Sequence, residues 1–449
     1  MLDLARIVKA YDIRGEVPGE LNEDVARALG AAFVRVLDVP AIVTAHDMRD
    51  SSVPLSRAFA EGATGQGADV IEAGLGSTDM LYFAAGSLDL PGAMFTASHN
   101  PAQYNGIKLC RAGATPVGQD TGLAEIRSMA EQGPRAHSGP LGTVTQRDLL
   151  PDYAGYLRGL VDLTGIRRLR VVVDAGNGMA GHTVPTVFAG LPLDLVPLYF
   201  ELDGTFPNHE ANPLVAENLR DLQSAVRSEG ADLGLAFDGD ADRCFVVDEQ
   251  GSPVPPSAIT ALVAVRELAR EPGATILYNL ITSHAVPEIV REHGGQPVRT
   301  RVGHSFIKAE MARTGAIFGG EHSAHYYYRD FWRADTGMLA ALHVLAALGG
   351  QDQPLSQVLT QFSRYAASGE INSTVGDSRA VTQRIEADFA GRDGAEIDHL
   401  DGLTVDLADG SWFNLRASNT EPLLRLNVEA ADSARMAALR GEVLALVRT

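Results

Sequence analysis

Short apolar runs alternate with longer amphipathic stretches along most of the chain. In the first part, apolar runs at residues 41–45, 69–73 and 93–95 predict strands, and the stretches at 26–37 and 54–65 predict helices. Alternating strands and helices are typical of βαβ units, whose strands pair in parallel. We therefore expect an α/β domain at the start of the chain.

Two further segments have the same layout. Their predicted strands lie at residues 170–174, 232–237, 274–277, 297–300 and 316–318. A helix is predicted at residues 216–226, and further helical stretches lie among the later strands. No residue-by-residue repeat accompanies this similarity in layout. We expect three related α/β domains with mixed, mainly parallel sheets.

The last segment differs, because no helices separate its predicted strands. Strands are expected at residues 404–407, 412–415 and 423–428, and one helix at 431–447 follows them. This order is typical of an α+β domain.

Polar joints that contain glycine separate the four segments. They lie near residues 138–140, 250–253 and 367–369. A chain of 449 residues is also too long for a single core. We therefore predict four domains, at residues 1–142, 143–250, 251–367 and 368–449.

The chain is strongly acidic. It has 57 Asp and Glu residues against 37 Lys and Arg residues, which gives a formal charge of −20. A surface of this sign repels nucleic acid and anionic membranes, so we expect neither as a partner. A site for an anionic substrate would need local positive charge against this background.

Lysine is rare, since it occurs only at positions 9, 108 and 308. Arginine supplies all the other positive charge, so a remaining lysine can mark a place that needs a compact ammonium group. Chance is the alternative explanation for so few residues. All three lysines lie next to candidate motifs, which favours a functional role.

The sequence favours a reducing, cytoplasmic location. No apolar run reaches the length that spans a bilayer, and the first residues lack the apolar core of a signal peptide. Only two cysteines are present, Cys110 and Cys244, and they lie far apart. A disulfide framework is therefore not expected.

The strongest local signal for chemistry is an acidic trio, Asp238, Asp240 and Asp242. Carboxylates at alternate positions of an extended loop project to one side, where a divalent cation would neutralise them. An all-oxygen set suits Mg²⁺ better than Zn²⁺. An EF-hand is rejected, because Arg243 takes the place of the required glycine and the flanking segments are predicted strands. A solvated acidic turn is the alternative.

Ser98 lies on a loop of small residues, TASHNP at 96–101, directly after a predicted strand. Open α/β sheets place their chemistry at such strand ends. Lys108 follows soon after, close enough to face this loop. An ordinary turn hydroxyl is the alternative for Ser98.

Three further stretches carry groups suited to sugars or anions, and each could also be an unliganded turn. Lys9 and Arg14 place two cations near a tyrosine. Residues 302–305 open a helix, with Lys308 one turn in, and such a helix start favours an anion. Glu321 and Ser323 follow a predicted strand and can bind sugar hydroxyls.

A final stretch, residues 416–422, collects hydroxyl, amide and guanidinium groups on one loop, with Arg425 beyond it. These groups donate hydrogen bonds to phosphate oxygens, and arginine can do so with both arms of its fork. A Ser/Asn/Thr turn without a ligand is the alternative.

Taken together, these motifs resemble the α-D-phosphohexomutase family over essentially the whole chain. Residues 96–101 match its T-A-S-H-N-P phosphoserine motif and residues 238–243 its D-G-D-A-D-R metal loop. Residues 321–325 match its G-E-x-S-x-H sugar loop, and residues 416–422 match its R-x-S-N-T-x-P phosphate loop. Four motifs in the right order make a chance match very improbable.

Within the family, the chain looks most like the bacterial phosphomannomutases. The features that favour them are residues 11–15, residues 203–209 and the variant at 320–323. Phosphoglucosamine mutases usually carry Gln where this chain has His322, so they resemble it less.

The resemblance implies four domains around a central cleft and a phosphoryl transfer between O6 and O1 of a hexose. Mannose 6-phosphate would become mannose 1-phosphate through a phosphoserine at Ser98 and a hexose 1,6-bisphosphate, which would also serve as activator. Phosphoglucomutase and phosphoglucosamine mutase are the alternatives within the family. The hexose phosphate is the expected partner, and nothing in the sequence sets the oligomeric state.

The resemblance also implies roles for individual residues. Mg²⁺ would be held by the acidic trio and the Ser98 phosphate, and Arg243 would add positive charge. Lys108 and His304 are the candidates for proton transfer, with Arg14 close by. Substrate binding is expected from Tyr11, His99, Glu321, Ser323, His325, Arg416, Ser418, Asn419, Thr420 and Arg425.

One feature departs from the family pattern. Relatives often have a basic residue just after the strand that is predicted here near residues 276–279, whereas this chain has Leu280, Ile281 and Thr282. His284 is the nearest titratable group, which leaves the substrate preference open.

Two other classes of function share part of this pattern. A metal-dependent phosphatase with Ser98 as nucleophile would need open access for water, which a mutase must exclude. A non-catalytic sugar-phosphate binding protein would not need an intact Ser98 and acidic trio. The separate sugar and phosphate loops favour the mutase.

Overall fold

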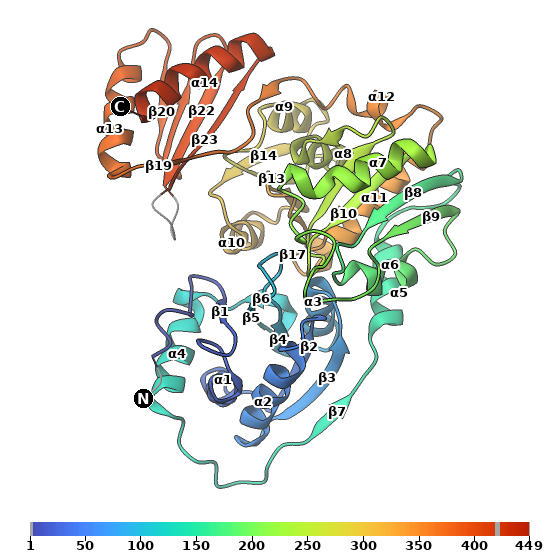
Figure 1. The fold of residues 1–449 in the computed structure, drawn as a ribbon, viewed down its shortest axis with the longest axis vertical. Helices are drawn as coiled ribbons and strands as arrows, with labels where there is room; N and C mark the ends of the chain where they lie inside the picture. The colour runs from blue at the N-terminus through green and yellow to red at the C-terminus, as the bar shows by residue number, and fades with distance from the viewer. Residues whose placement is uncertain (1–2, 418–422, 449) are drawn as a thin grey trace.

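The computed structural model describes residues 3–417 and 423–448, with only the backbone of residues 304 and 305. Its strands form four sheets that follow one another along the chain. Figure 1 shows the first sheet with its helices at the bottom, and the last sheet at the upper left, beyond the third. In this part of the chain, no helix is both long and apolar enough to cross a bilayer.

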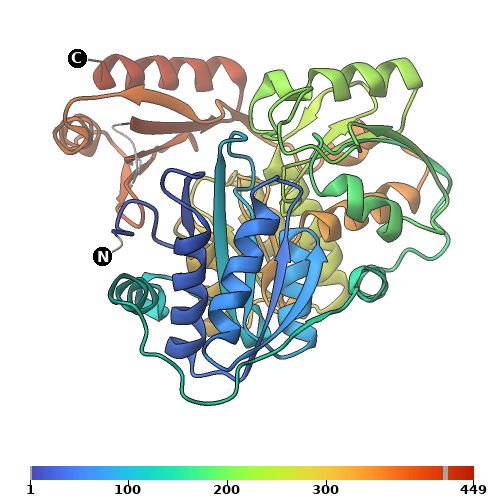
Figure 2. The same ribbon diagram turned by 60° about the horizontal axis from the view of Figure 1, so that its bottom comes forward.

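The first sheet has the strand order β1-β5-β4-β2-β3-β7, and β6 pairs with β5. The pairs among β4, β2, β3 and β7 are parallel, whereas β5 runs antiparallel to its neighbours. Helices α1 and α2 lie side by side over one face of this sheet (Figure 2). The elements are β1 (Ile13–Glu16), α1 (Glu23–Leu37), β2 (Ala41–His46), α2 (Ser52–Thr64), β3 (Asp69–Leu75), α3 (Thr78–Ser87), β4 (Gly92–Phe95), β5 (Tyr104–Arg111), β6 (Thr115–Pro116), α4 (Leu123–Gln132) and β7 (Val144–Gln146).

The second sheet has the order β12-β11-β10-β8-β9. Strands β9, β8 and β10 pair in parallel, and β10 and β11 form an antiparallel hairpin. Both hairpin strands are buried along their whole length. The elements are α5 (Leu150–Leu160), β8 (Leu169–Asp174), α6 (Ala180–Val187), β9 (Leu193–Leu198), α7 (Arg220–Glu229), β10 (Leu233–Phe237), β11 (Cys244–Asp248) and β12 (Pro253–Val254).

The third sheet has the order β14-β13-β15-β16-β17. Its last three strands pair antiparallel, β15 with β16 and β16 with β17. Its long helix α11 is buried along almost its whole length. The elements are α8 (Pro256–Arg270), β13 (Thr275–Asn279), α9 (Ala285–Glu292), β14 (Gln296–Thr300), α10 (His304–Thr314), β15 (Phe318–Gly320), β16 (Tyr326–Tyr328), β17 (Ala334–Asp335), α11 (Gly337–Gly349) and α12 (Leu355–Leu359).

The fourth sheet has the order β18-β23-β22-β21-β20, with β19 also paired to β23. All of its pairs are antiparallel, as expected for the α+β segment. The elements are β18 (Ala366–Ala367), β19 (Ile371–Thr374), α13 (Ser378–Ala390), β20 (Glu396–Asp398), β21 (Leu403–Asp406), β22 (Trp412–Ala417), β23 (Leu423–Ala430) and α14 (Ser433–Val447).

The strands predicted from apolar runs all overlap strands of the structure, one of them with a shift, and the structure has further strands, such as β5 and β9, that no run predicted. The run at residues 316–318 predicts a strand, but β15 begins at Phe318 and continues through two glycines. Gly315 ends helix α10 in the left-handed conformation, so the residues that follow it complete the turn out of the helix. The chain reaches β13 at Ile317, whose N–H donates to the Thr275 carbonyl at 3.1 Å.

Apolar cores divide the molecule differently from its sheets. One continuous cluster of buried side chains runs from helix α3 through the second and third sheets. The fourth sheet has a separate core of its own, with Phe389, Phe413 and Val443 among its members. The first three sheets therefore share one apolar cluster. The first sheet also has a separate core with helices α1 and α2, which includes Phe33, Phe59 and Phe95, just as the fourth sheet has its own.

A buried carboxylate joins the first three segments. Asp79, at the start of α3, accepts hydrogen bonds from the hydroxyls of Ser77, Tyr153 (2.7 Å) and Thr336 (2.6 Å). Burial raises the pKa of Asp79 to about 6, although the three hydroxyl donors oppose the shift. Removing any one donor would leave a buried oxygen with fewer partners.

This pKa predicts a pH-dependent contribution to stability. Because the pKa of Asp79 in the folded protein lies above its ordinary 3.8, the folded state binds the proton more tightly, and the resulting stability is lost as the pH rises through 6. The free energy of unfolding should fall by about 1 kcal/mol from this group between pH 5.5 and 7.5. Urea unfolding of Asp79→Asn should lack this fall, and an identical pH dependence in both proteins would contradict the assignment.

Candidate active site

Ser98 lies on a sharp turn at the carboxyl end of β4. Its backbone adopts the left-handed conformation (φ 50°), and its N–H donates to Thr96 Oγ1 at 2.9 Å. The Ser98 hydroxyl donates to Asp238 Oδ2 at 2.8 Å, and the residue is 5% exposed. The motif serine of the first sheet is thus in direct contact with the acidic loop of the second.

The acidic trio lies in the hairpin turn between β10 and β11. One oxygen each from Asp238, Asp240 and Asp242 lie within 4.8 Å of one another, and all three residues are buried. Gly239 permits this loop to approach Ser98, because a Cβ at that position would lie 2.4 Å from the Ser98 carbonyl oxygen. The two loops therefore meet with no room for a larger residue.

The trio fits a divalent cation. Among the described residues, the Oδ1 atoms of Asp240 and Asp242 are buried without a hydrogen-bond partner. Unpaired buried carboxylate oxygens are costly unless a cation or donor meets them. An all-oxygen set of this kind suits Mg²⁺.

Lys108 and Arg243 each balance part of this negative charge. Lys108 Nζ, on β5, lies 2.7 Å from Asp240 Oδ2 and 2.7 Å from Asp242 Oδ2. Burial lowers the pKa of Lys108, but these carboxylates outweigh it and hold the pKa well above its ordinary value. Lys108 in turn holds the pKa of Asp240 far below its usual range, against the effect of burial. Lys108 is therefore a protonated partner of the trio.

Arg243 joins the acidic loop to the Ser98 loop. Its Nε donates to Asp238 Oδ2 at 2.9 Å, and its Nη2 donates to His99 Nδ1 at 2.5 Å. Burial raises the pKa of Asp238 to about 8, with Asp242 and Asp240 adding to the shift and Arg243 opposing it. Burial, with the charge of Arg243, also holds the pKa of His99 well below its ordinary value. His99 is thus neutral, with its proton on Nε2.

A cavity of about 170 Å³ opens onto these groups. Arg14, on β1, reaches it and donates to Asn100 Oδ1 at 2.6 Å and to Asp12 Oδ2 at 2.5 Å. The lining draws on the first three sheets: Tyr11, Asp12, Arg14, Tyr82, Ser98, His99, Lys108, Leu109, Pro116, Asp242, Arg243, His325 and Asp335.

The third sheet contributes His325 and its neighbours to this cavity. His325 Nε2 lies 3.7 Å from Asp242 Oδ1, and its Nδ1 lies 3.0 Å from Ser323 Oγ. Glu321 is buried, and its Oε1 accepts from the Gly303 N–H (3.1 Å) and from Asn279 (3.2 Å). Its Oε2 accepts from Tyr327 OH at 2.7 Å.

Several predicted residues cannot be placed in this geometry. Ser418, Asn419 and Thr420 lie outside the described residues. For His304 only the backbone is described, as the first residue of α10. The site roles predicted for these residues therefore stay predictions.

The two arginines beside that gap face each other across β22 and β23. Arg416 and Arg425 are cross-strand partners, and both point to Glu370, at 3.9 and 3.5 Å respectively. They bring two positive charges close together near the end of β22 and the start of β23.

The three lysines have different surroundings. Lys108 is in the site, and Lys308 is buried on Asp335 at 2.8 Å, with its ammonium 4.1 Å from the centre of the Tyr82 ring. Lys9 is exposed and donates to a backbone carbonyl. Lys108 thus lines the cavity at Ser98, whereas Lys308 and Lys9 do not, and a functional role for the rare lysines stays a prediction.

Sequence reasoning missed several residues that hold the site together. Thr78 donates to Asp240 Oδ2 at 2.5 Å, and its N–H donates to the Asp240 carbonyl at 3.0 Å. Asp47 and Arg49 follow β2, the strand beside β4, and lie beneath the Ser98 loop. Their position directly after a neighbouring strand was the one available signal.

The departure at residues 280–282 means that no basic side chain directly follows β13, where relatives often have one. Leu280 and Ile281 are buried. His284 instead stacks on Trp412, with the ring centres 5.1 Å apart, and its Nε2 lies 3.4 Å from Asp406. It therefore connects the third segment to the fourth.

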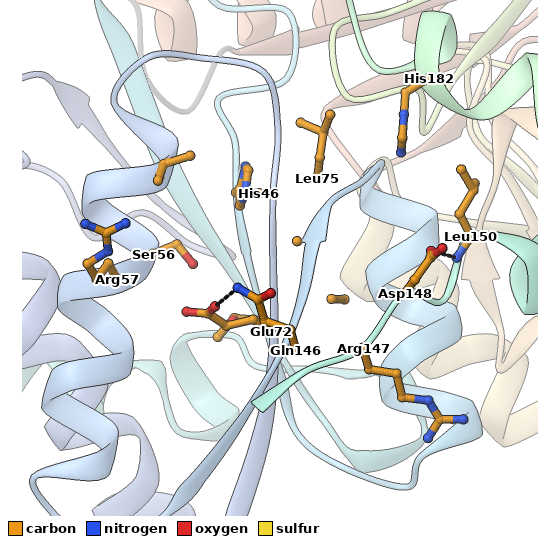
Figure 3. Close-up of a pocket in the computed structure, with 14 residues that line it drawn as sticks. His46, Ser56, Arg57, Glu72, Leu75, Gln146, Arg147, Asp148, Leu150 and His182 are labelled. Atoms are coloured by element: carbon orange, nitrogen blue, oxygen red, sulfur yellow. Dashed lines mark hydrogen bonds between the residues drawn. The ribbon is translucent and has the colours of Figure 1, made fainter. Parts of the chain in front are cut away.

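A larger cavity of about 500 Å³ lies away from this chemistry. It is bordered by α2, β3, β7 and helix α6 of the second segment. Figure 3 shows His46 and His182 around it, with Glu72 and Gln146 joined at 3.5 Å. None of the motif residues that the structure describes is part of its lining.

Comparison with known families covers nearly the whole chain. The models described as phosphoglucomutase/phosphomannomutase domains I, II, III and the C-terminal domain match residues 5–136, 151–251, 255–365 and 370–446. The chain is 42% identical over 452 residues to a phosphomannomutase of Escherichia coli, with 98% of each protein covered. The chain belongs to the phosphoglucomutase/phosphomannomutase family.

Other relatives agree with this assignment. The chain is 40% identical over 444 residues to the phosphohexose mutases of Xanthomonas campestris, with 98% of each covered. A solved phosphoglucomutase/phosphomannomutase family protein from Burkholderia thailandensis has a TM-score of 0.90 and 34% identity, covering 100% of this chain and 98% of that one. The fold class expected from the sequence is confirmed.

The acidic trio predicts a stabilising response to Mg²⁺. Binding at a concentration about 100 times the dissociation constant adds about 2.7 kcal/mol to stability, so thermal melting should shift upward by several degrees. Asp240→Asn should abolish the shift, because it removes one ligand charge. Asp248→Asn is the matched control, since Asp248 is a buried carboxylate of the same hairpin that caps a turn instead. Equal shifts in both variants would argue against a cation at the trio.

Proposed function

We propose that this protein interconverts mannose 6-phosphate and mannose 1-phosphate through a phosphorylated Ser98. The observation that carries the proposal is the 2.8 Å contact between the Ser98 hydroxyl and Asp238, one of three clustered carboxylates. Relatives at 40–42% identity that are named phosphomannomutase support the reaction.

The proposed cycle transfers phosphate twice. Starting from mannose 6-phosphate, the O1 hydroxyl oxygen attacks phosphorus on Ser98, the P–Oγ bond breaks, and the hydroxyl proton passes to a base. The products are a hexose 1,6-bisphosphate and a Ser98 oxygen that regains a proton. After the sugar has turned over, Ser98 Oγ attacks the 6-phosphate and the sugar O6 leaves with a proton. Phosphoserine is restored, and a hexose 1,6-bisphosphate can rephosphorylate a Ser98 that has lost its phosphate.

The charges around Ser98 suit phosphoryl transfer, which depends mainly on positioning and on neutralising phosphate oxygens. Mg²⁺, held by Asp238, Asp240 and Asp242, would act as a Lewis acid on the phosphate. Arg243 supplies a fixed positive charge beside Ser98, and Lys108 supplies another. Arg14 lines the same cavity and extends this positive region toward the sugar.

Proton transfer needs an acid and a base near the reacting oxygens. Lys108 and His304 are the groups proposed from the family resemblance. The raised pKa keeps Lys108 protonated, so it cannot accept a proton at neutral pH. The imidazole of His325 also lines the cavity, and it is a candidate acceptor, because the neutral His99 has its Nδ1 occupied by Arg243.

The sugar and its second phosphate are assigned to the third and fourth segments. Glu321 Oε2 accepts one hydrogen bond from Tyr327, and a carboxylate oxygen can accept a second from a sugar hydroxyl. Ser323 follows two residues later. Arg416 and Arg425 would bind the distal phosphate together with Ser418, Asn419 and Thr420. Tyr11 and His99 complete the proposed substrate site.

The preference for mannose rests on the relatives and not on one visible contact. His322, which separates this chain from the glucosamine enzymes in sequence, lines a cavity of about 140 Å³ between the third and fourth segments. It is therefore outside the cavity at Ser98. Phosphoglucomutase activity is the second candidate, because the family name covers both sugars.

Burial of Ser98 favours the mutase over a phosphatase. The residue is 5% exposed and is enclosed by His99, Asp238 and Gly239. A phosphoserine that is shielded from bulk water loses little phosphate to hydrolysis.

We retain the domain limits 1–142, 143–250, 251–367 and 368–449. We also propose a reducing cytoplasm as the location, since Cys110 and Cys244 are both buried and free.

The proposal predicts a covalent phosphate on Ser98. Intact-mass measurement of the purified protein should show a fraction heavier by one phosphate after incubation with a hexose 1,6-bisphosphate. Ser98→Ala should show none and should lose mutase turnover. If no such adduct forms and mannose 1-phosphate is not turned over, the proposed function is wrong.

Substrate preference is tested by direct comparison. We expect the highest kcat/KM with mannose 1-phosphate, lower values with glucose 1-phosphate and the lowest with glucosamine 1-phosphate, all measured after priming with the same bisphosphate. A preference for glucosamine phosphate would overturn the mannose assignment while leaving the mutase reaction intact.

A further inference from the structure

The main chain of the Ser98 loop is wrapped around one buried guanidinium group. Arg49 Nη2 donates to the carbonyl oxygens of Ser98 (2.9 Å) and Asn100 (2.7 Å). Its Nη1 donates to the carbonyl oxygens of Pro101 (2.9 Å) and Tyr104 (3.0 Å). A single side chain thus holds four carbonyls of the loop that contains the motif serine.

Arg49 is itself fixed from below. Its backbone N–H donates to Asp47 Oδ1 at 3.0 Å, and its Nε lies 3.3 Å from Asp47 Oδ2. Asp47 also accepts from Ser52 Oγ at 2.5 Å, and its backbone N–H donates to the Phe95 carbonyl at the end of β4. The guanidinium is therefore anchored to the same pair of strands that positions Ser98.

The second segment covers Arg49 from above. The guanidinium carbon lies 5.0 Å from the centre of the Phe206 ring. A Cβ on Gly204 would lie 2.7 Å from the Arg49 Cα, so this cover is in close contact. The Arg49 side chain is only 1% exposed as a result.

These contacts separate Arg49 from the groups that meet the substrate. Its side chain is sealed from solvent, and the donors at its terminal nitrogens are directed at backbone carbonyls. It is also not among the residues described as lining the cavity at Ser98. Any effect of Arg49 on the reaction must therefore act through the position of the loop.

The loop needs such support, because Ser98 has a left-handed backbone conformation that a residue with a Cβ adopts only at a cost. The Ser98 carbonyl that Arg49 holds belongs to this strained residue. If the loop relaxed, Ser98 Oγ would move relative to Asp238. Displacement of a reacting group by about 1 Å can reduce a rate by about 100-fold.

We propose that Arg49 is a positioning residue that holds the Ser98 loop in register with the acidic trio, and so sets the rate of phosphoryl transfer rather than the affinity for the sugar. The rate claim rests on the proposed mutase function. The fork of arginine is essential here, because the single nitrogen of lysine cannot reach four carbonyls on two sides.

The test compares Arg49→Lys with Arg158→Lys in the full-length protein. Arg158 is the matched control, since its Nη1 also donates to backbone carbonyls, those of Thr186 (2.9 Å) and Val187 (3.1 Å), but in the second segment and away from Ser98. For each protein we would measure the melting temperature, kcat and KM for mannose 1-phosphate after priming, and amide hydrogen exchange over residues 96–104.

Arg49→Lys should lower kcat by about 100-fold and leave KM within about threefold, with faster hydrogen exchange confined to residues 96–104. Arg158→Lys should leave kcat, KM and this exchange at their wild-type values. A kcat loss below about threefold in a folded Arg49→Lys protein would overturn the proposal. So would an equal loss in Arg158→Lys, since that would point to general destabilisation.

If Arg49→Lys does not fold, Gly204→Ala provides a second test of the role of Arg49. The added Cβ presses on the Arg49 backbone without changing any charge, so kcat should fall while KM is kept and exchange over residues 96–104 rises. Unchanged exchange and unchanged kcat would contradict the proposal. Absence of turnover in the wild-type protein would instead refute the mutase function, and the exchange measurement would still decide whether Arg49 holds the loop.

Discussion

The cost of burying three carboxylates beside one hydroxyl governs the arrangement of this molecule. Asp238, Asp240 and Asp242 lie together at a hairpin turn where water cannot solvate them, and an unpaired buried charge is expensive. Lys108 from the first sheet and Arg243 from the turn itself offset part of that cost. The Oδ1 atoms of Asp240 and Asp242 are buried without a hydrogen-bond partner among the described residues, and they suit a cation. Contact between the first and second segments supplies Lys108 to the trio, and the same contact places Ser98 beside it.

The same contact explains why rigid support accumulates around the Ser98 loop. Thr78 holds the acidic loop from one side, and Arg49 holds the serine loop from the other. Asp79 connects the first three segments through three hydroxyls. These segments also share a continuous apolar cluster. The fourth segment has a core of its own. It meets the third through His284, Trp412 and the pair Arg299–Asp398, which are polar and aromatic contacts at the boundary.

Local signals in the sequence predicted much of this fold and the chemistry at its centre. Apolar runs marked the strands, and the loops after β4 and between β10 and β11 carried their motifs in consecutive residues. Arg49, Thr78 and Asp79 could not be predicted in the same way, because their partners are 49 to 257 residues away in the chain. A buried ion pair or a hydroxyl cluster leaves no periodic pattern. The shift of β15 has a similar origin, since Gly315 and the pairing with β13, rather than the apolar run, decide where that strand begins.

The central claim is that Ser98 passes its phosphate to a sugar and not to water. It is tested most directly by mixing phosphorylated protein with one equivalent of mannose 1-phosphate and quenching the reaction at successive times. We expect phosphate to leave Ser98 and to appear as hexose 1,6-bisphosphate at the same rate, with no inorganic phosphate released on that timescale. Release of inorganic phosphate at the rate at which Ser98 loses its phosphate would contradict it.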